Sequence, residues 1–317
     1  MRQETIAWCA GLPFHDLLKG VRLGSVSYLN ARPLVEGLPQ EQVVYEVPAK
    51  LTERFLAGEL DAALVPVFPL LQQREAWMVD GVGIGCRGAV YSVLMAYQGA
   101  FSAIREVLVD PASRSSTNLL QCLAHTYWKQ PMRYVAEATA RTTARLIIGD
   151  PAIAFRQAQE RRQADGGGLA FPAADSQNAD PENTLAEGLQ GQAGTGGRDA
   201  GVTIAVGDEP WQICDLGEAW FEATGLPFVF AGWAIRPGHP EPERLAEGLR
   251  AAARFGLLQR EVIAKRTEDP GFALHYLMEF IRYDLQADEK RGLERFWEGL
   301  VESELLGSTQ KPVLHFV

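Results

Sequence analysis

The chain has 317 residues, of which 47% are hydrophobic, and this length is enough for about two domains of ordinary size. Its formal net charge of −10 comes from 40 acidic against 30 basic residues, and no dense run of Lys and Arg occurs along it. Such a run would be needed to neutralise a series of phosphates, so the composition argues against nucleic acid as a partner.

The cysteines and the N-terminus argue against a metal site and against a membrane partner. The cysteines are scattered, without a CxxC or a Cys/His ligand spacing, and are predicted to be reduced thiols. Residues 1–20, broken by Gly11 and Pro13, make a poor signal peptide. No window approaches the ~20 apolar residues that a membrane span requires. We therefore expect a soluble, cytoplasmic protein with a short N-terminal extension over residues 1–20.

Strand-like and helix-like segments alternate over the first part of the chain, which predicts a βαβαβ arrangement with a parallel sheet. One helix is predicted over Lys50–Ala57, because Leu51 and Phe55 fall at helical spacing and Gly58 follows where a helix ends. Another helix begins at about Ala31. The predicted strands are Val21–Val26, Val43–Val47, Ala62–Val67, Val82–Ile84 and Val90–Ala96.

A polar turn follows the first predicted strand and carries Ser25, Ser27 and Asn30. Strand-to-helix turns are where open α/β sheets place ligands, and the N–H groups that begin a helix point there as well. The turn therefore predicts a site for an anionic small molecule. Asn30 has two open interpretations, a ligand contact or an N-terminal helix cap shortly before Pro33.

The pattern repeats in the second part of the chain. The strand Val107–Val109 is followed by the polar cluster Ser113–Thr117 and a helix, then by the strand Met132–Val135. The strand Leu146–Ile148 runs into Gly149 and Asp150. Polar residues thus again collect where a strand turns into a helix, and the chain is predicted to form two similar α/β halves.

Between about residues 157 and 201 the composition changes to Gly, Ala, Gln, Asp and Asn. This composition predicts a disordered insert, favoured over a functional lid because the segment lacks aromatic or charged anchors. The aromatic strand-like run Thr224–Arg236 could cross between the two halves. Three amphipathic windows then predict a C-terminal helical layer: Glu241–Leu258, Phe272–Leu285 and Glu289–Leu300.

Several ordered motifs together resemble the chorismate dehydratases of the futalosine route to menaquinone, the MqnA family. The resemblance covers the chain apart from its first ~20 residues and the Gly-rich insert, and the insert is the main departure from the family pattern. The motifs are SYLNARPL (Ser27–Leu34), GELDAALVPV (Gly58–Val67), GAVYSVL (Gly88–Leu94), SRSS (Ser113–Ser116), IIGD (Ile147–Asp150), DLGEAW (Asp215–Trp220), TGLPFVFAGWA (Thr224–Ala234) and IRYDL (Ile281–Leu285).

The resemblance implies an α/β fold like that of the periplasmic solute-binding proteins of type II, with two lobes around a cleft. The first lobe would hold residues 21–103 plus 233–317, and the second would hold residues 104–232 with the insert. It also implies the reaction, in which chorismate loses water to give 3-[(1-carboxyvinyl)oxy]benzoate, and a carbon–oxygen lyase that needs no cofactor.

The family's substrate contacts match Asn30 and Ser92, which we take as the catalytic pair. Arg114 is interpreted either as a bidentate partner of a carboxylate or as part of a surface or inter-lobe salt bridge. No His lies in the matched motifs, so we expect the substrate's own enolpyruvyl carboxylate to take the C3 proton, with Asp150 as the alternative base. The predicted substrate-binding residues are Ser27, Tyr28, Ser113, Arg114, Ser115, Ser116, Asp150 and Phe228.

Three other functions are considered. A solute-binding protein that captures a small carboxylate without chemistry would share the fold. The sister enzyme that makes 1,4-dihydroxy-6-naphthoate uses a His base, which the matched motifs lack. A sensory effector-binding domain is disfavoured because the chain has no basic DNA-reading stretch.

Overall fold

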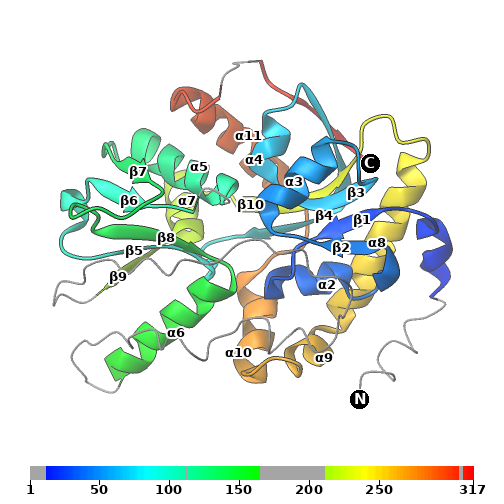
Figure 1. Ribbon diagram of the computed structural model, residues 1–317, viewed down its shortest axis with the longest axis horizontal. Helices are drawn as coiled ribbons and strands as arrows, with labels where there is room; N and C mark the ends of the chain where they lie inside the picture. The colour runs from blue at the N-terminus through cyan, green and yellow to red at the C-terminus, as the bar shows by residue number, and fades with distance from the viewer. Residues whose placement is uncertain (1–11, 111–112, 165–210, 307–309) are drawn as a thin grey trace.

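The computed structural model describes residues 12–110, 113–164, 211–306 and 310–317, and its strands form two separate sheets (Figure 1). The first sheet combines the N-terminal strands with two strands from the C-terminal part of the chain. Its strands are β1 (Leu23–Ser25), β2 (Val43–Tyr45), β3 (Ala62–Pro66), β4 (Glu75–Cys86), β10 (Phe228–Ile235) and β11 (Val313–Phe316), in the order β11-β4-β10-β3-β1-β2.

The second sheet is built from the middle of the chain and lies beside the first, on the left in Figure 1. Its strands are β5 (Val93–Tyr97), β6 (Glu106–Leu108), β7 (Arg133–Val135), β8 (Ala144–Ile148) and β9 (Gln212–Asp215), in the order β7-β6-β8-β5-β9.

The two sheets repeat one plan. In each, three strands run parallel: β2, β1 and β3 in the first sheet and β7, β6 and β8 in the second. The next strand, β10 or β5, runs antiparallel to its neighbours. The predicted βαβαβ arrangement with a parallel sheet is confirmed for β1, β2 and β3, and the antiparallel strand β10 extends that sheet. In each sheet the antiparallel strand is the first one that the chain forms after it crosses over from the other sheet. It runs opposite to the three parallel strands.

The chain crosses between the sheets twice, at residues 87–92 and again at residues 216–227. The aromatic run predicted to cross between the halves supplies β10, the strand that follows the second crossing. The predicted lobe bounds of 103/104 and 232/233 stay a prediction. Strand pairing alone places β5 in the second sheet and β10 in the first.

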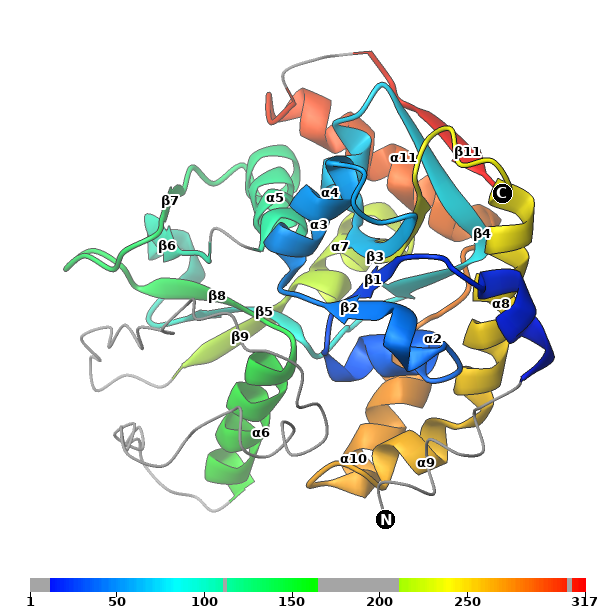
Figure 2. The same cartoon turned by 45° about the vertical axis from the view of Figure 1, so that its right-hand side comes forward.

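Helices cover both sheets, and Figure 2 shows them from a second direction. Those packed around the first sheet are α2 (Arg32–Val35), α3 (Pro48–Leu56), α4 (Val67–Leu71), α8 (Pro242–Leu258), α9 (Arg260–Ala264), α10 (Pro270–His275) and α11 (Ala287–Glu302). Those that follow strands of the second sheet are α5 (Arg114–Cys122), α6 (Asp150–Ala164) and α7 (Leu216–Thr224). Shorter turns of helix are η1 (Pro13–Leu18), η2 (Leu29–Ala31), η3 (Gln40–Gln42), η4 (Phe101–Ala103), η5 (Leu123–Tyr127) and η7 (Tyr276–Phe280).

Helix α6 corrects the predicted start of the Gly-rich insert at about residue 157, because the helix continues to residue 164. Glu160 accepts a hydrogen bond from the Tyr91 hydroxyl at 2.7 Å and pairs with Arg156 one turn earlier. Gln159 is buried. The Tyr91 contact ties the polar helix to the segment just before β5. The rest of the predicted insert lies outside the described residues.

Two other predicted segments differ in detail. The N-terminal extension is described from residue 12, and its η1 turn packs against α8 with Leu18 fully buried. The predicted helix Phe272–Leu285 ends early: α10 passes into the π-helical turn η7, and the chain is extended from Ile281. Both differences follow from tertiary packing that amphipathic periodicity does not report.

One large hydrophobic core extends across both sheets. Trp220 of α7 lies with its ring centroid 5.3 Å from that of Phe228 and 6.0 Å from that of Phe296 on α11. The second crossing is thereby packed between the sheets. No helix in the described part of the chain is long and apolar enough to cross a membrane.

Candidate functional site

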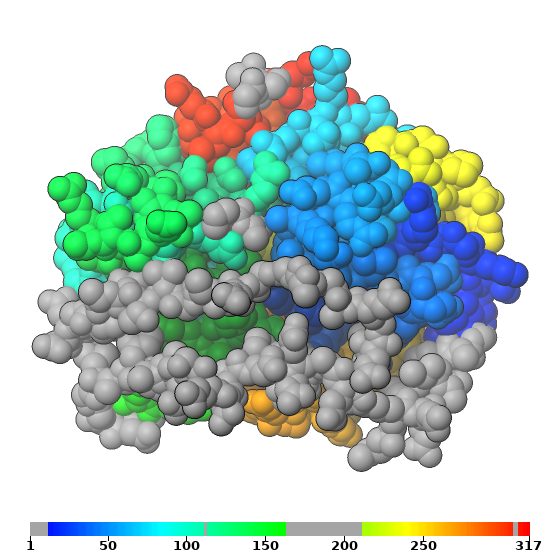
Figure 3. All heavy atoms as spheres, viewed as in Figure 1, coloured from blue at the N-terminus to red at the C-terminus, as the bar shows by residue number. Residues whose placement is uncertain are grey.

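An open cavity lies between the two sheets, and its empty space, including solvent at the mouth, is about 700 Å³. Figure 3 shows the two halves of the molecule side by side, with the N-terminal residues (blue) on the right and residues from the middle of the chain (green) on the left. The lining is mostly apolar, with a few polar side chains that converge from both halves, as is typical of small-molecule sites. The polar or charged lining residues are Tyr28, Asn30, Ser92, Ser113, Arg114, Ser115 and Ser116.

Asn30 reaches the cavity from the turn between β1 and α2. The N-cap of α2 is Ala31, and no side chain makes a capping hydrogen bond there, so the interpretation of Asn30 as a helix cap is wrong. The backbone carbonyl of Asn30 accepts a hydrogen bond from the Tyr283 hydroxyl at 2.9 Å. The turn is thus held from the C-terminal part of the chain, and the Asn30 side chain lines the cavity.

Ser92 lies at the end of the first crossing, and a buried carboxylate fixes this segment. Asp215 accepts hydrogen bonds from the backbone N–H groups of Val90 at 3.0 Å and Tyr91 at 2.7 Å, and from Arg156 at 3.0 Å. Tyr91 has φ 68°, a strained conformation for a residue other than glycine. The Arg156 guanidinium lies 4.3 Å from the centroid of the Tyr91 ring. Together these contacts hold the strained turn that delivers Ser92.

The Ser92 hydroxyl has a buried partner that the sequence analysis missed. The Tyr276 hydroxyl donates a hydrogen bond to the Ser92 Oγ at 2.7 Å. Burial raises the pKa of Tyr276, and the neighbouring Ser92 and Asn30 side chains act in the opposite direction. Tyr276 begins η7 and is 1% exposed. In the sequence it is one aromatic residue in an amphipathic window, a pattern that predicts core packing and gives no sign of a polar role.

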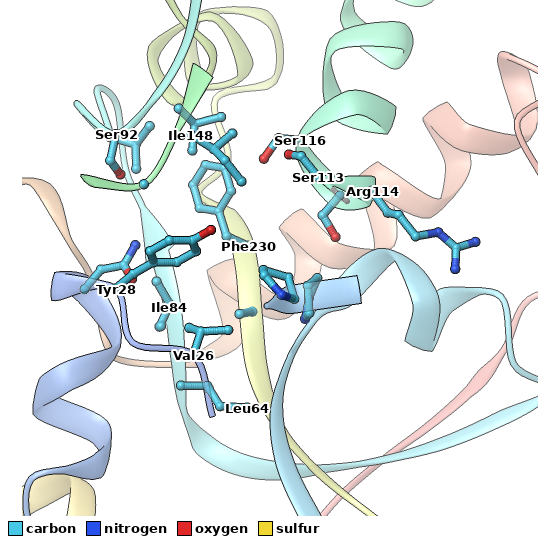
Figure 4. Close-up of a pocket in the computed structure, with 18 residues that line it drawn as sticks. Val26, Tyr28, Leu64, Ile84, Ser92, Ser113, Arg114, Ser116, Ile148 and Phe230 are labelled. Carbon is cyan, nitrogen blue, oxygen red and sulfur yellow. The ribbon is translucent and has the colours of Figure 1, made fainter. Parts of the chain in front are cut away.

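The opposite side of the cavity is the beginning of α5 (Figure 4). Ser113 is the N-cap residue, but its hydroxyl makes no capping bond, is buried, and has no hydrogen-bond partner among the described residues. The Ser113 and Ser116 side chains lie across the cavity from Ser92 and Tyr28 (Figure 4). This side therefore offers hydroxyl and helix N–H donors to an anion.

Two residues of the same cluster serve other partners. The Ser115 Oγ accepts a hydrogen bond from the Phe68 backbone N–H at 3.0 Å, which joins α5 to α4 across the cleft. The Arg114 guanidinium donates to Gln72 at 3.0 Å, lies 5.7 Å from the centroid of the Phe68 ring and points away from the cavity (Figure 4). Arg114 thus bridges the two halves, but to a neutral amide rather than in the salt bridge considered above.

A second contact across the cleft lies beside Tyr28. A Cβ atom on Gly149 would come within 3.1 Å of the Tyr28 ring, and Gly149 has φ 66°, so only glycine fits there without strain. The next residue, Asp150, accepts a hydrogen bond from the Leu29 backbone N–H at 3.1 Å. Burial raises the pKa of Asp150, while the Leu29 bond and the Arg32 charge act in the opposite direction.

Three of the predicted substrate-binding residues do not line the cavity. Ser27 is exposed, and Asp150, next to Gly149, accepts a hydrogen bond from the Leu29 backbone instead. Phe228 is 1% exposed and packs on Trp220 and Phe296, whereas its neighbour Phe230 lines the cavity. Core packing is therefore what the structure shows for Phe228. Within the described ranges, no group of three or more His, Cys, Asp or Glu side chains is placed to hold a metal ion.

Comparisons with known proteins agree with this architecture. A family model described as menaquinone biosynthesis matches residues 21–167 and 192–302. A chorismate dehydratase of Thermus thermophilus is 30% identical over 291 residues, which is 88% of this chain and 94% of that protein.

Two solved structures share the fold at low sequence identity. A protein of Archaeoglobus fulgidus superposes with a TM-score of 0.58 at 13% identity, over 90% of this chain and 98% of that one. The periplasmic aliphatic sulphonate-binding protein of Escherichia coli superposes with a TM-score of 0.50 at 13% identity, over 91% and 94% of the two chains. The expected fold, two α/β lobes like those of periplasmic binding proteins, is confirmed. The chain belongs to the menaquinone-biosynthesis family that includes chorismate dehydratase.

Proposed function

We propose that this chain is a chorismate dehydratase that binds chorismate in the cavity between its two sheets and releases 3-[(1-carboxyvinyl)oxy]benzoate and water. The observation that carries the proposal is the chemistry of the lining: neutral donors converge from both sides on an apolar cavity, and no lining residue is a carboxylate. Chorismate is a cyclohexadiene ring with two carboxylates, and donors with apolar walls complement both its ring and its charge.

The reaction removes the C3 proton and the C4 hydroxyl of the ring. The electron pair released from the C3–H bond moves through the ring diene onto the ring carboxylate, and then returns to expel the C4 oxygen as the ring becomes aromatic. The hydroxyl leaves with the abstracted proton as water. Aromatisation drives the overall conversion, so the main task of the protein is to stabilise the negative charge that develops on the ring carboxylate.

We assign the stabilisation of that charge to the side chains of Asn30 and Ser92. The Ser92 side chain is held in place before a ligand arrives by the Tyr276 hydroxyl, and the crossing segment before it is held by Asp215. The turn that carries Asn30 is held by the bond from Tyr283 to its backbone carbonyl. Donors fixed in advance stabilise a developing charge without reorganising during the reaction. The enolpyruvyl carboxylate is charged before the reaction begins. We propose that Ser113, Ser116 and the first N–H groups of α5 bind it by hydrogen bonds.

The base is assigned to the substrate. Among the lining residues there is no Asp, Glu or His, so the nearest carboxylate to C3 in the complex is the enolpyruvyl group itself. Because the Arg114 guanidinium is bonded to Gln72, the enolpyruvyl carboxylate has no guanidinium partner. Its pKa is therefore higher than that of an ion-paired carboxylate. A carbon–oxygen lyase that works without a cofactor, in the cytoplasm, remains part of the proposal.

Asp150→Asn tests the base directly. The amide oxygen of Asn can still accept the Leu29 N–H bond, so the local fold is retained while any proton-accepting role is lost. We expect turnover within about twofold of the unmodified chain, a difference too small for the loss of a general base, which costs on the order of 10²-fold or more. Lost turnover with unchanged ligand affinity would make Asp150 the base instead.

The function is tested by incubating the purified chain with chorismate and measuring the loss of one water by mass and the change in ultraviolet absorbance. Asn30→Ala and Ser92→Ala are compared with Ser102→Ala, a control at an exposed serine outside the cavity. Dehydration that falls in the first two variants and persists in the control would support the proposal. Chorismate binding without water loss would identify a binding protein, and no binding would contradict the proposal.

A further inference from the structure

The Tyr276 ring is locked in place within the core. It stacks on Phe272 with ring centroids 6.0 Å apart and an interplanar angle of 15°, and it lies 6.4 Å from the ring of Phe280. Its side chain does not line the cavity, so it has no direct contact with a ligand there. Any influence of Tyr276 on the reaction must therefore pass through the residues to which its hydroxyl is bonded.

The hydroxyl joins the two side chains that we assign to the developing charge. It donates its proton to the Ser92 Oγ at 2.7 Å. The Asn30 side chain acts on the same hydroxyl, since both it and Ser92 lower the pKa of Tyr276. Burial has the larger effect and raises the pKa, so the hydroxyl stays protonated at neutral pH.

The direction of these bonds decides what Ser92 can do. A serine hydroxyl has one proton to donate and two lone pairs. Because Tyr276 occupies a lone pair of the Ser92 oxygen, the proton of Ser92 remains available to an acceptor in the cavity. Tyr276 thus links Ser92, to which it donates, with the Asn30 side chain, and hydrogen bonds in such a cluster polarise one another.

We propose that Tyr276 is a positioning residue for the dehydration, whose hydroxyl orients Ser92 as a hydrogen-bond donor toward the substrate carboxylate and couples it to Asn30. This proposal rests on the proposed function. It names a residue outside the matched motifs, on a helical turn far along the chain from the polar turn and the crossing that carry its partners.

The test is a double-mutant cycle of Tyr276→Phe and Ser92→Ala, with kcat, KM for chorismate and melting temperature measured for each protein. Phe keeps the stacked ring and removes only the hydroxyl. Tyr134→Phe, on β7 outside the cavity, controls for the loss of a tyrosine hydroxyl elsewhere.

We expect Tyr276→Phe to lower kcat about tenfold, the effect of one lost hydrogen bond, with KM changed less than about twofold. In the Ser92→Ala protein the same change should lower kcat by less than about threefold, because the side chain through which it mainly acts is already gone. An equal loss in both backgrounds would show a merely structural role and overturn the proposal, as would an unchanged kcat in Tyr276→Phe.

A second variant covers the case in which Tyr276→Phe does not fold. Incorporating 3,5-difluorotyrosine at position 276 keeps the ring and the hydroxyl but makes the hydroxyl more acidic. Since a phenolate cannot donate to Ser92, we expect kcat to fall at a lower alkaline pH than in the unmodified chain. An unchanged pH profile would overturn the proposal.

Failure of the proposed function is separable from failure of this inference. If the unmodified chain does not dehydrate chorismate, the proposed function fails. The double-mutant cycle is then repeated with the affinity for 3-[(1-carboxyvinyl)oxy]benzoate, measured by calorimetry, in place of kcat. Weaker binding in Tyr276→Phe that disappears in the Ser92→Ala background supports the orienting role, and equal weakening in both backgrounds contradicts it.

Discussion

The two sides of the cavity differ in how their hydroxyl groups are satisfied. On the side that carries Asn30 and Ser92, the Ser92 hydroxyl is bonded to Tyr276, and the segment before it is anchored on Asp215. On the α5 side, the Ser113 hydroxyl is buried without a partner among the described residues. A buried hydroxyl without a partner costs stability, and a ligand that supplies the partner recovers it. The comparison teaches that one side is organised in advance for a developing charge and the other is left open for a charge that the ligand brings.

The largest effect is expected on the organised side. Ser92→Ala should lower kcat by on the order of 10²–10³-fold, as for the loss of one donor from an oxyanion site, with little change in KM. Steady-state kinetics with chorismate measure both constants. If KM rose while kcat stayed unchanged, Ser92 would serve ground-state binding and the comparison would break.

The next effect concerns the contact that brings the two halves together beside Tyr28. Gly149→Ala places a methyl group 3.1 Å from the Tyr28 ring at a residue with φ 66°, and we expect it to destabilise the chain by about 2 kcal/mol. Urea unfolding measures the change, with the neighbouring helical substitution Gln157→Ala as a control. A loss below about 0.5 kcal/mol would mean that the close approach is not a constraint.

Ser113→Ala sharpens the comparison on the open side. Removing an unpartnered buried hydroxyl should stabilise the ligand-free chain by about 1 kcal/mol and raise KM about tenfold, with kcat nearly unchanged. Unfolding and kinetics on the same preparation give both quantities. A destabilised variant would show that the hydroxyl already has a structural partner.

The smallest effect is the pH dependence of stability at Asp150, whose carboxylate joins the two halves through Leu29. Burial raises its pKa above the unfolded value of 3.8, so the folded chain binds the proton more tightly than the unfolded chain. Stability then declines as pH rises from 3.8 through the raised pKa. Asp150→Asn cannot ionise, and its stability relative to the unmodified chain should increase over that window. Parallel pH profiles of the melting temperature for the two proteins would contradict this.

Local patterns predicted the first half of the fold well. The segments that became β1, β2, β3 and α3 carry their own periodicity and their own turn residues, so short windows suffice to find them. Helix α6 was missed because it is polar on most sides, and its order comes from contacts such as Tyr91 to Glu160. The antiparallel strands β5 and β10 were missed as such because their direction depends on where the chain crosses between sheets.

The site was predictable in composition but not in roles. The family motifs named Asn30, Ser92 and the cluster at the beginning of α5, all of which line the cavity. The difference between Ser113 and Ser115 depends on a bond to Phe68 that no local window contains. Tyr276 was missed for the same reason, since only the fold brings its hydroxyl to Ser92. The catalytic assignments of Asn30 and Ser92 stay predictions.

The most direct test is a crystal structure of the chain with 3-[(1-carboxyvinyl)oxy]benzoate bound. The benzoate carboxylate should lie within hydrogen-bond distance of Asn30 and Ser92, with the enolpyruvyl carboxylate at Ser113, Ser116 and the first N–H groups of α5. A product bound the other way round, or outside this cavity, would contradict the division of work between the two sides.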